Sequence, residues 1–157
     1  MRFVTDGMLG KLTRWLRMLG HDVEYANNIN DQELIRIAKE EKRILLTSDL
    51  QLYQQATTRN VEAFLVEGKN EVERLSNIAK RFSIKLEIDI SLAYCSKCNG
   101  KIEPVAKESL IGKIPKNTFT YYNEFWKCQK CGQIYWRGAH WKRISKTLEE
   151  AKQLLKS

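Results

Sequence analysis

An α/β fold with a parallel sheet, followed by a small four-cysteine zinc ribbon, is predicted by three features of the sequence. Residues 1–90 alternate short β-rich runs with segments of helical periodicity, which is the pattern of parallel strands joined by helices. All four cysteines lie after residue 90. The 157 residues suffice for one α/β core and a small module, but not for two full domains. We therefore expect one domain over residues 1–90 and a zinc ribbon with a C-terminal helix over residues 91–157.

Four runs are the candidate strands of the sheet, and they span 2–5, 22–26, 43–47 and 61–66. A first helix is expected between the first two strands, because apolar residues recur on one helical face and Gly20 follows as a stop. The apolar residues of this face are Met8, Leu12, Trp15, Leu16 and Leu19. The opposite face carries Lys11, Arg14 and Arg17.

Further helices are predicted from caps and periodicity. A helix over 31–42 is expected because Asn30 and Glu33 resemble a capping box. Its inward residues should be Leu34, Ile37 and Ala38. A short helix should follow Asp49, and another should span 71–82, where apolar residues recur at core spacing. Residues 147–155 are amphipathic and should form a final helix that packs back on the body.

The cysteines form two matched pairs, Cys95-x-x-Cys98 and Cys128-x-x-Cys131. One such turn brings two thiolates within reach of a tetrahedral metal, and two turns complete a closed four-sulfur site suited to zinc. Because sulfur fills every position, the metal should be structural. Disulfides are disfavoured without an export signal, and a thioredoxin-like redox site would need a single pair after a strand. Iron is the alternative metal.

The residues around the cysteine pairs support turns at the metal. Asn99-Gly100 and Gly132 follow the second cysteine of each pair, and these residue types tolerate the left-handed conformation that turns backbone amides toward sulfur. The long stretch between the pairs leaves room for a β-hairpin or a loop.

Acidic residues lie at the ends of predicted strands. Asp6 and Asp49 close the first and third strands, and the carboxyl ends of parallel strands share the edge where α/β proteins bind ligands. Asp31 and Glu33 begin a helix and could join them there. Clustered carboxylates bind Mg²⁺ or Mn²⁺, which can activate water at a phosphodiester, so this is a nuclease-type arrangement. The alternative is that each carboxylate only caps a helix or complements its dipole.

Positive charge is concentrated after residue 90. Lys+Arg and Asp+Glu number 14 and 14 up to that residue, but 13 and 5 beyond it. Such an excess suits a polyanion, although it also keeps a small module soluble and offsets four thiolates. The candidate nucleic-acid contacts there are Lys127, Lys130, Arg137, Lys142 and Arg143. Lys11 and Arg14 could guide a phosphate backbone toward Asp6, or could be a solvated helix face.

Aromatic residues accompany the basic ones. They are Phe119, Tyr121, Tyr122, Phe125, Trp126, Tyr135, Trp136 and Trp141. Bases stack on aromatic rings while basic side chains hold phosphates, so the mixture suits single-stranded nucleic acid. The alternative is that many of these rings form the small core of the ribbon and its contact with the body.

The segments 3–12, 15–20, 43–49, 94–100 and 128–141 together resemble the Mut-seven C-terminal ribonuclease family, a PIN-like nuclease domain followed by a zinc ribbon. The resemblance implies a PIN-like parallel-sheet sandwich that cuts RNA with a divalent metal, and it places the motif positions at Asp6, Asp31 and Asp49. Many PIN-like domains carry a further acidic residue two positions after the third aspartate. Here that position is Gln51, and Glu33 is a candidate substitute.

The function expected from these observations is a metal-dependent, endonucleolytic ribonuclease. It would hold structural zinc and catalytic Mg²⁺ or Mn²⁺, and act in the cytoplasm on RNA with accessible single strands. The sequence shows no membrane-spanning run. Two alternatives remain open: an inactive RNA-binding module of the same fold, which Gln51 favours, and a protein-interaction module in a larger RNA-processing assembly. Nothing in the sequence indicates the oligomeric state.

Overall fold

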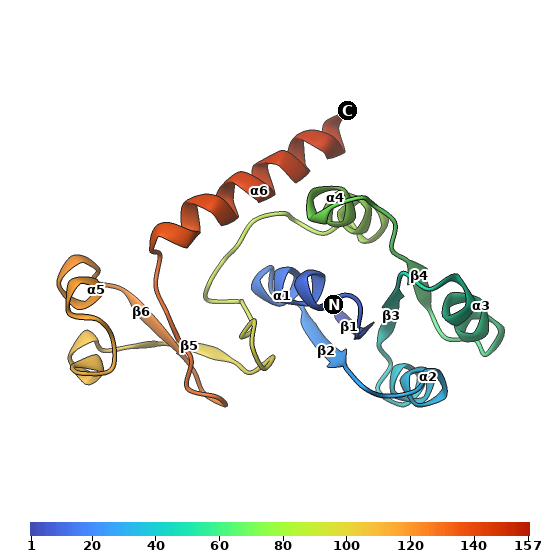
Figure 1. The fold of residues 1–157 in the computed structure, drawn as a ribbon, viewed down its shortest axis with the longest axis horizontal. Coiled ribbons are helices and arrows are strands. Elements are labelled where there is room, and N and C mark those ends of the chain that lie inside the picture. The colour runs from blue at the N-terminus through green and yellow to red at the C-terminus, as the bar shows by residue number, and fades with distance from the viewer.

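A computed structural model describes residues 1–157 and contains two separate sheets (Figure 1). The first sheet is parallel, has four strands in the order β2-β1-β3-β4, and confirms the predicted α/β class. Its strands are β1 (Arg2–Asp6), β2 (Asp22–Ala26), β3 (Ile44–Thr47) and β4 (Ala63–Leu65). Each predicted run therefore contains a strand, and the third and fourth strands are shorter than predicted.

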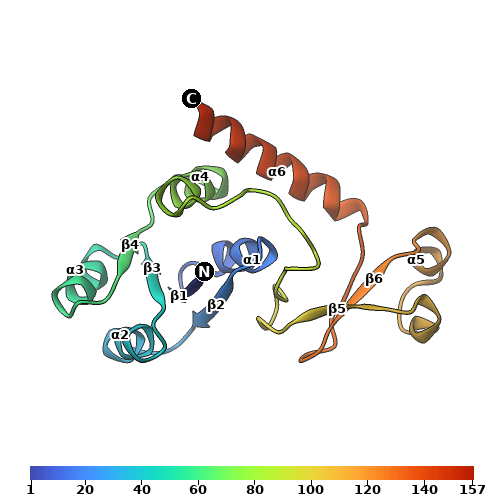
Figure 2. The ribbon, with the colours of Figure 1, turned by 180° about the vertical axis from the view of Figure 1, so that it is seen from behind.

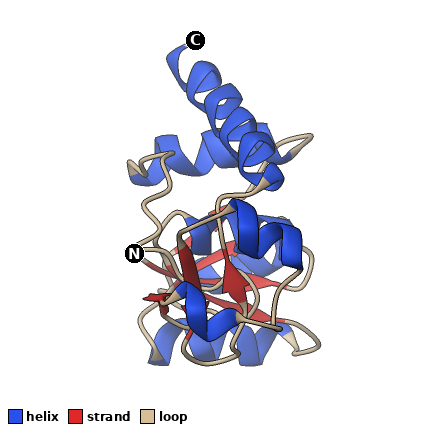
Figure 3. Cartoon of the chain, turned by 90° about the vertical axis from the view of Figure 1, so that its left-hand side faces the viewer, coloured by secondary structure: helices blue, strands red, loops and turns tan.

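Helices cover both faces of the parallel sheet, so the strands lie between helical layers (Figure 3). The helices are α1 (Gly10–Met18), α2 (Asp31–Glu40), α3 (Leu50–Thr58) and α4 (Glu71–Phe82). Two of them begin at asparagine caps: the Asn30 side chain accepts a hydrogen bond from the Glu33 amide at 2.8 Å, and Asn70 accepts one from Glu73 at 2.9 Å. These caps satisfy amides that a helix start leaves unpaired.

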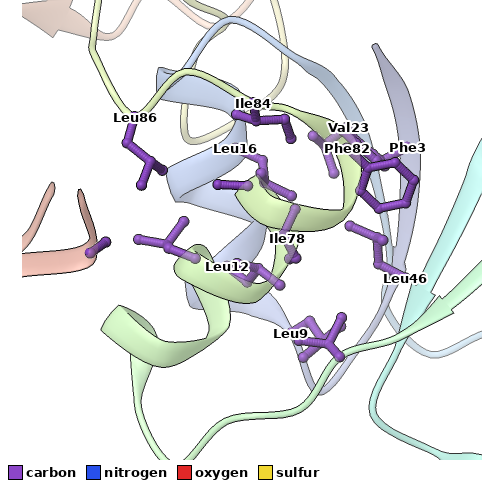
Figure 4. Close-up of a cluster of buried hydrophobic side chains, with 14 of the residues drawn as sticks. Phe3, Leu9, Leu12, Leu16, Val23, Leu46, Ile78, Phe82, Ile84 and Leu86 are labelled. Carbon is purple, nitrogen blue, oxygen red and sulfur yellow. The ribbon is translucent and has the colours of Figure 1, made fainter. Parts of the chain in front are cut away.

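The alternation of side chains along β1 divides the core in two. Phe3 packs with α1 and α4 on one face, and Val4 packs with α2 and α3 on the other. Figure 4 shows Leu12 and Leu16 of α1 meeting Ile78 of α4 on the first face. Residues buried to this extent contribute strongly, since truncating a core leucine to alanine costs about 2–5 kcal/mol.

The second sheet is antiparallel and belongs to the ribbon. Its strands are β5 (Ile102–Val105), β6 (Phe125–Cys128) and β7 (Ile134–Tyr135), in the order β5-β6-β7. The stretch between the cysteine pairs holds more than the expected hairpin or loop, because a 3-10 helix (Lys107–Leu110) and α5 (Lys116–Tyr121) lie between β5 and β6.

The final helix, α6 (Ala139–Lys156), returns along α4 after the ribbon (Figure 1, Figure 2). Its Leu148 and Ala151 are buried in the same cluster as Ile78 and Phe3, which confirms the expected packing on the body. The helix begins well before the predicted start at residue 147, because the basic residues of its first turns hide the apolar period. The division into domains at residue 90 stays a prediction.

Two residues of the first helix lie where the periodicity did not predict. Met8 was expected on the inward face but is 78% exposed, because the helix begins only at Gly10. Arg17 was expected on the exposed face but is 6% exposed, because its guanidinium donates to the carbonyl oxygens of Val23 at 2.9 Å and Ser96 at 3.0 Å. A smaller difference occurs in α2, where Ile35 is buried and Ile37 only partly so.

Candidate functional site

A pocket of about 240 Å³ lies at the carboxyl edge of the parallel sheet. Asp6, Asp31 and Asp49 all line it, although they come from three separate strand or helix ends. We call it the acidic pocket; its other lining residues are Gly7, Met8, Ala26, Asn28, Ile29, Leu34 and Leu52. The structure therefore brings together the three aspartates that were expected to meet at this edge.

Asp6 is the most firmly held of the three aspartates. It ends β1, is 9% exposed, and its Oδ1 accepts a hydrogen bond from the Met8 amide at 2.8 Å. Its Oδ2 accepts a hydrogen bond from the hydroxyl of Thr47, the last residue of β3. Two donors from different elements thus fix the orientation of this carboxylate.

Asp49 follows β3 and caps α3. Its Oδ1 accepts hydrogen bonds from the amides of Gln51 at 2.9 Å and Leu52 at 3.4 Å, so the capping role weighed from the sequence is present. Both bonds use one oxygen, which leaves Oδ2 available to a ligand in the acidic pocket.

Thr47 links these two aspartates and was missed by the sequence reasoning. Its fully buried hydroxyl accepts a hydrogen bond from the Asp49 amide at 3.0 Å and donates to Asp6. The signal was present, since a polar residue at the buried end of a parallel strand needs a partner.

Asp31 and Glu33 differ in where they lie. Asp31 is in the exposed first turn of α2 and lines the acidic pocket, whereas Glu33 does not. The Glu33 carboxylate instead accepts a hydrogen bond from Arg36 Nε at 2.9 Å. The Arg36 hydrogen bonds hold the pKa of Glu33 below its ordinary value. The structure therefore pairs Glu33 with Arg36 rather than joining it to the three aspartates.

The donor set of the acidic pocket suits Mg²⁺ or Mn²⁺, which prefer carboxylate oxygens. The four cysteines are the one group of possible metal ligands that converges closely, with sulfur atoms all within 4.8 Å of one another, and the three aspartates do not form such a group. Since Mg²⁺ usually keeps several waters, it does not require carboxylates in mutual contact.

The four cysteines form a compact sulfur cluster that could bind a metal such as zinc. Cys95 Sγ lies 3.7 Å from Cys131 Sγ, and Cys98 Sγ lies 3.4 Å from Cys128 Sγ. The amides of Lys130 and Cys131 point to Cys128 Sγ at 3.3 and 3.4 Å. Burial opposes ionisation of this thiol, but those amide bonds prevail and lower the pKa of Cys128 to about 6.

The turns at the cysteines have the predicted backbone. Asn99 and Gly132 both adopt positive φ, at 68° and 82°. Gly100 is required for a different reason, since a Cβ there would lie 2.8 Å from Cys128 Sγ. Tyr135, which the sequence reasoning missed, places its hydroxyl 2.9 Å from Cys95 Sγ and thereby adds a hydrogen bond outside the sulfur cluster.

The predicted nucleic-acid contacts fall into two groups. Lys11 lines a second pocket, of about 310 Å³, which shares Gly7 and Met8 with the acidic pocket, while Arg14 is exposed and lines neither. Glu71, missed by the sequence reasoning, lines this second pocket and has a buried Oε2 without a hydrogen-bond partner. The ribbon group consists of Lys127, Lys130, Arg137, Lys142 and Arg143, and none of them lines the acidic pocket.

Within the ribbon group, Arg137 is engaged with aromatic rings. Its guanidinium lies 5.1 Å from the ring centre of Trp126 and 5.7 Å from that of Trp141. It also donates to Glu124 at 3.0 Å. Lys127 is half-buried in β6, and Lys130, Lys142 and Arg143 are exposed.

Comparisons with known proteins give one match. A family model described as the Mut7-C RNAse domain matches residues 1–148 of the chain. Neither the curated proteins nor the solved structures yield a match. None of the helices has both the length and the apolar character that crossing a membrane requires.

Proposed function

The chain belongs to the Mut7-C RNAse domain family, and from this premise we propose that it is a divalent-metal-dependent ribonuclease whose centre is the acidic pocket. The observation that carries the proposal is the meeting of Asp6, Asp31 and Asp49 in one pocket at the carboxyl edge of the sheet. Family membership supports RNA as the substrate class, and the acidic pocket holds the group of residues that would act on it.

Each aspartate has a distinct task in this proposal. Asp6, oriented by Thr47 and by the Met8 amide, would hold the metal in a fixed direction. Asp49 would contribute the carboxylate oxygen that its capping bonds leave unused, and Asp31, at the start of α2, would complete the set. The chemistry that Mg²⁺ or Mn²⁺ supplies when bound is activation of a water and neutralisation of charge on the phosphate.

A site of three aspartates is favoured over one with a fourth acidic ligand. Glu33, the candidate substitute for the residue at position 51, is paired with Arg36. Gln51 itself engages Asp49 through its backbone amide. We therefore propose a single metal bound by Asp6, Asp31 and Asp49.

A second pocket beside the acidic pocket favours cleavage within an RNA strand over cleavage at its end. The second pocket, which Lys11 lines, continues from it through Gly7 and Met8. An RNA strand crossing both pockets would pass over the aspartates rather than end at them. The ribbon, folded by structural zinc, would add affinity through its basic and aromatic residues.

The test is cleavage of an end-labelled single-stranded RNA in Mn²⁺ and then in Mg²⁺. Asp6→Asn and Asp49→Asn should abolish cleavage while zinc content and circular dichroism stay as in the wild type. The matched control is Asp89→Asn, the same chemical change at an exposed residue outside the acidic pocket, which should cut normally. Binding without cleavage in every metal would replace the proposal with an inactive RNA-binding module, which the Gln51 position favours.

A further inference from the structure

The largest pocket of the ribbon lies at the opposite end of α1 from the aspartates. It measures about 630 Å³ and is bounded by Met18 at the end of α1, by Tyr122 after α5, by Tyr135 of β7 and by the first turns of α6. We call it the ribbon pocket. Its volume falls within the range of about 300–1,000 Å³ that is usual for small-ligand sites.

The wall of the ribbon pocket is apolar and aromatic. Twelve of its seventeen lining residues are hydrophobic, and Tyr122, Trp136 and Trp141 are only partly buried. Gln133 and His140 add polar groups to this wall. Flat rings with a few hydrogen-bonding groups at their margin are the surroundings in which proteins hold unpaired bases.

Basic residues lie next to lining residues of the pocket in the sequence, although none of them lines it. Arg137 is adjacent in sequence to the lining residue Trp136, and Lys142 and Arg143 follow the lining residue Trp141 on α6. All three basic residues are exposed. Arg137 is paired with Glu124, whereas Lys142 and Arg143 form no ion pair within the chain. Lys142 and Arg143 are therefore the cations that the phosphates beside a bound base would meet, and an apolar segment of a protein partner would not use them.

We propose that the ribbon pocket binds one unpaired base of the RNA at a fixed distance from the cut. This inference rests on the proposed function for the identity of the polymer. Met8, just before α1, lines the acidic pocket, and Met18, at the end of α1, lines the ribbon pocket. The two pockets are thus apart by about the length of α1, which is roughly 13 Å for nine residues at about 1.5 Å each. At about 3.4 Å per stacked nucleotide, the bound base lies some four nucleotides from the scissile phosphate.

The first cysteine turn, where zinc would bind, fixes the position of one residue that lines the pocket. The hydroxyl of Tyr135 contacts Cys95 Sγ at 2.9 Å and Ser96 Oγ at 3.2 Å, so the metal-binding turn holds one wall in place. Gly138 lets the chain turn closely past another wall, since a Cβ there would lie 2.7 Å from Trp136 Nε1. The ribbon pocket is thus built by the ribbon together with residues of the body, among them Met18 and Ile88.

The first arm of the test is an abasic scan with the wild-type protein. Fluorescein-labelled oligouridylates carrying a single abasic residue, moved one position at a time, are measured for binding without added divalent metal and for the position of cleavage with Mn²⁺. One abasic position, at a constant distance from the cut, should weaken binding about tenfold, because stacking of one base on aromatic rings contributes about 1–3 kcal/mol. Equal binding at every abasic position overturns the inference.

The second arm blocks the pocket. Ala139 lines the ribbon pocket and is exposed, so Ala139→Trp should fill the pocket without removing a packed side chain. Ser145→Trp adds the same bulk at an exposed position of α6 outside the pocket and is the matched control. Ala139→Trp should weaken binding of intact RNA about tenfold. For the RNA that is abasic at the bound position, the variant and the wild type should bind with equal affinity. Identical binding by the two variants contradicts the inference, and the abasic scan decides it if Ala139→Trp fails to fold.

The two proposals fail in different ways. Metal-dependent cleavage with a flat abasic scan would leave the ribonuclease intact and assign the ribbon pocket to another occupant, such as a protein partner. A position-dependent scan without cleavage in any metal would remove the nuclease and retain the base pocket.

Discussion

Asn99, in the turn of the first cysteine pair, accepts a hydrogen bond from the backbone amide of Val23 at 3.0 Å. Val23 is in β2, one of the two edge strands of the parallel sheet, and the Asn99 side-chain amide also donates to Asp22 of that strand at 2.7 Å. The ribbon therefore occupies an edge that would otherwise expose unpaired backbone groups. Because β2 ends at Ala26 in the acidic pocket, the turn of the first cysteine pair and the proposed catalytic centre contact opposite parts of one strand.

Arg17→Met should destabilise the protein by about 2–3 kcal/mol. The change leaves the carbonyl oxygens of Val23 and Ser96 without the charged donor that joins the body to the ribbon. Urea unfolding followed by circular dichroism measures the effect. Arg14→Met, on an exposed position of the same helix, should shift the free energy of unfolding by no more than about 0.5 kcal/mol. Equal shifts for the two variants would show that the buried guanidinium does not hold the two parts together.

Removal of zinc should loosen β2 as well as the ribbon. A structural four-cysteine site contributes folding free energy, so a zinc chelator should disorder the turn that carries Ser96 and Asn99. The Val23 amide would then lose its acceptor, and its hydrogen exchange should accelerate. Exchange mass spectrometry of peptides covering β2 measures this, with β3, which is interior to the sheet, as the internal reference. Unchanged protection of Val23 after zinc loss would show that the edge is held without the metal.

Thr47→Val should lower the cleavage rate about ten- to one hundred-fold, because groups that orient metal ligands commonly have effects of that size. It should also lower the free energy of unfolding by about 1–3 kcal/mol, because the Asp6 carboxylate and the Asp49 amide lose a buried partner. The variant keeps the shape of the side chain but removes the hydroxyl that donates to Asp6 and accepts from Asp49. Thr47→Ser restores the hydroxyl and should recover most of the activity. Initial rates over a series of Mn²⁺ concentrations separate weaker metal binding from a slower step. A Thr47→Val enzyme with wild-type rates would remove Thr47 from the positioning of Asp6.

The features predicted correctly from the sequence are those set by neighbouring residues. Strand 22–26 and helix 71–82 have the bounds expected from their periodicity. Parallel strands place their carboxyl ends at one edge, so the meeting of Asp6 and Asp49 in one pocket followed from local patterns.

The features missed depend on partners distant in the chain. Arg17 is buried because Ser96, 79 residues away, accepts its hydrogen bond. No periodicity within the first helix contains that information. Thr47 is similar, since its partner Asp6 belongs to a strand 41 residues earlier.

Stability should fall as the pH decreases from 7, because His21 is held neutral in the folded protein. Burial is the main cause, followed by the positive N-terminal amine 3.1 Å from Nδ1, and together they lower the pKa of His21 to about 4. In the unfolded chain His21 has a pKa of about 6.5, so between pH 6.5 and pH 4 the unfolded chain binds more protons than the folded protein. The free energy of unfolding is therefore unaffected by His21 above pH 6.5 and decreases as the pH falls toward 4. Between pH 7 and pH 5.5 the loss should be about 1 kcal/mol after allowance for solvent screening.

Urea unfolding at those two pH values, with zinc content measured in each sample, tests this expectation. His21→Gln should reduce the pH dependence by about the same 1 kcal/mol, because glutamine does not titrate. His140→Gln, at the other histidine, which is exposed, should retain the wild-type dependence. If His21→Gln loses as much stability as the wild type between pH 7 and pH 5.5, protonation of His21 does not cause the decline, and the acid sensitivity must lie with other groups such as the metal-binding thiols.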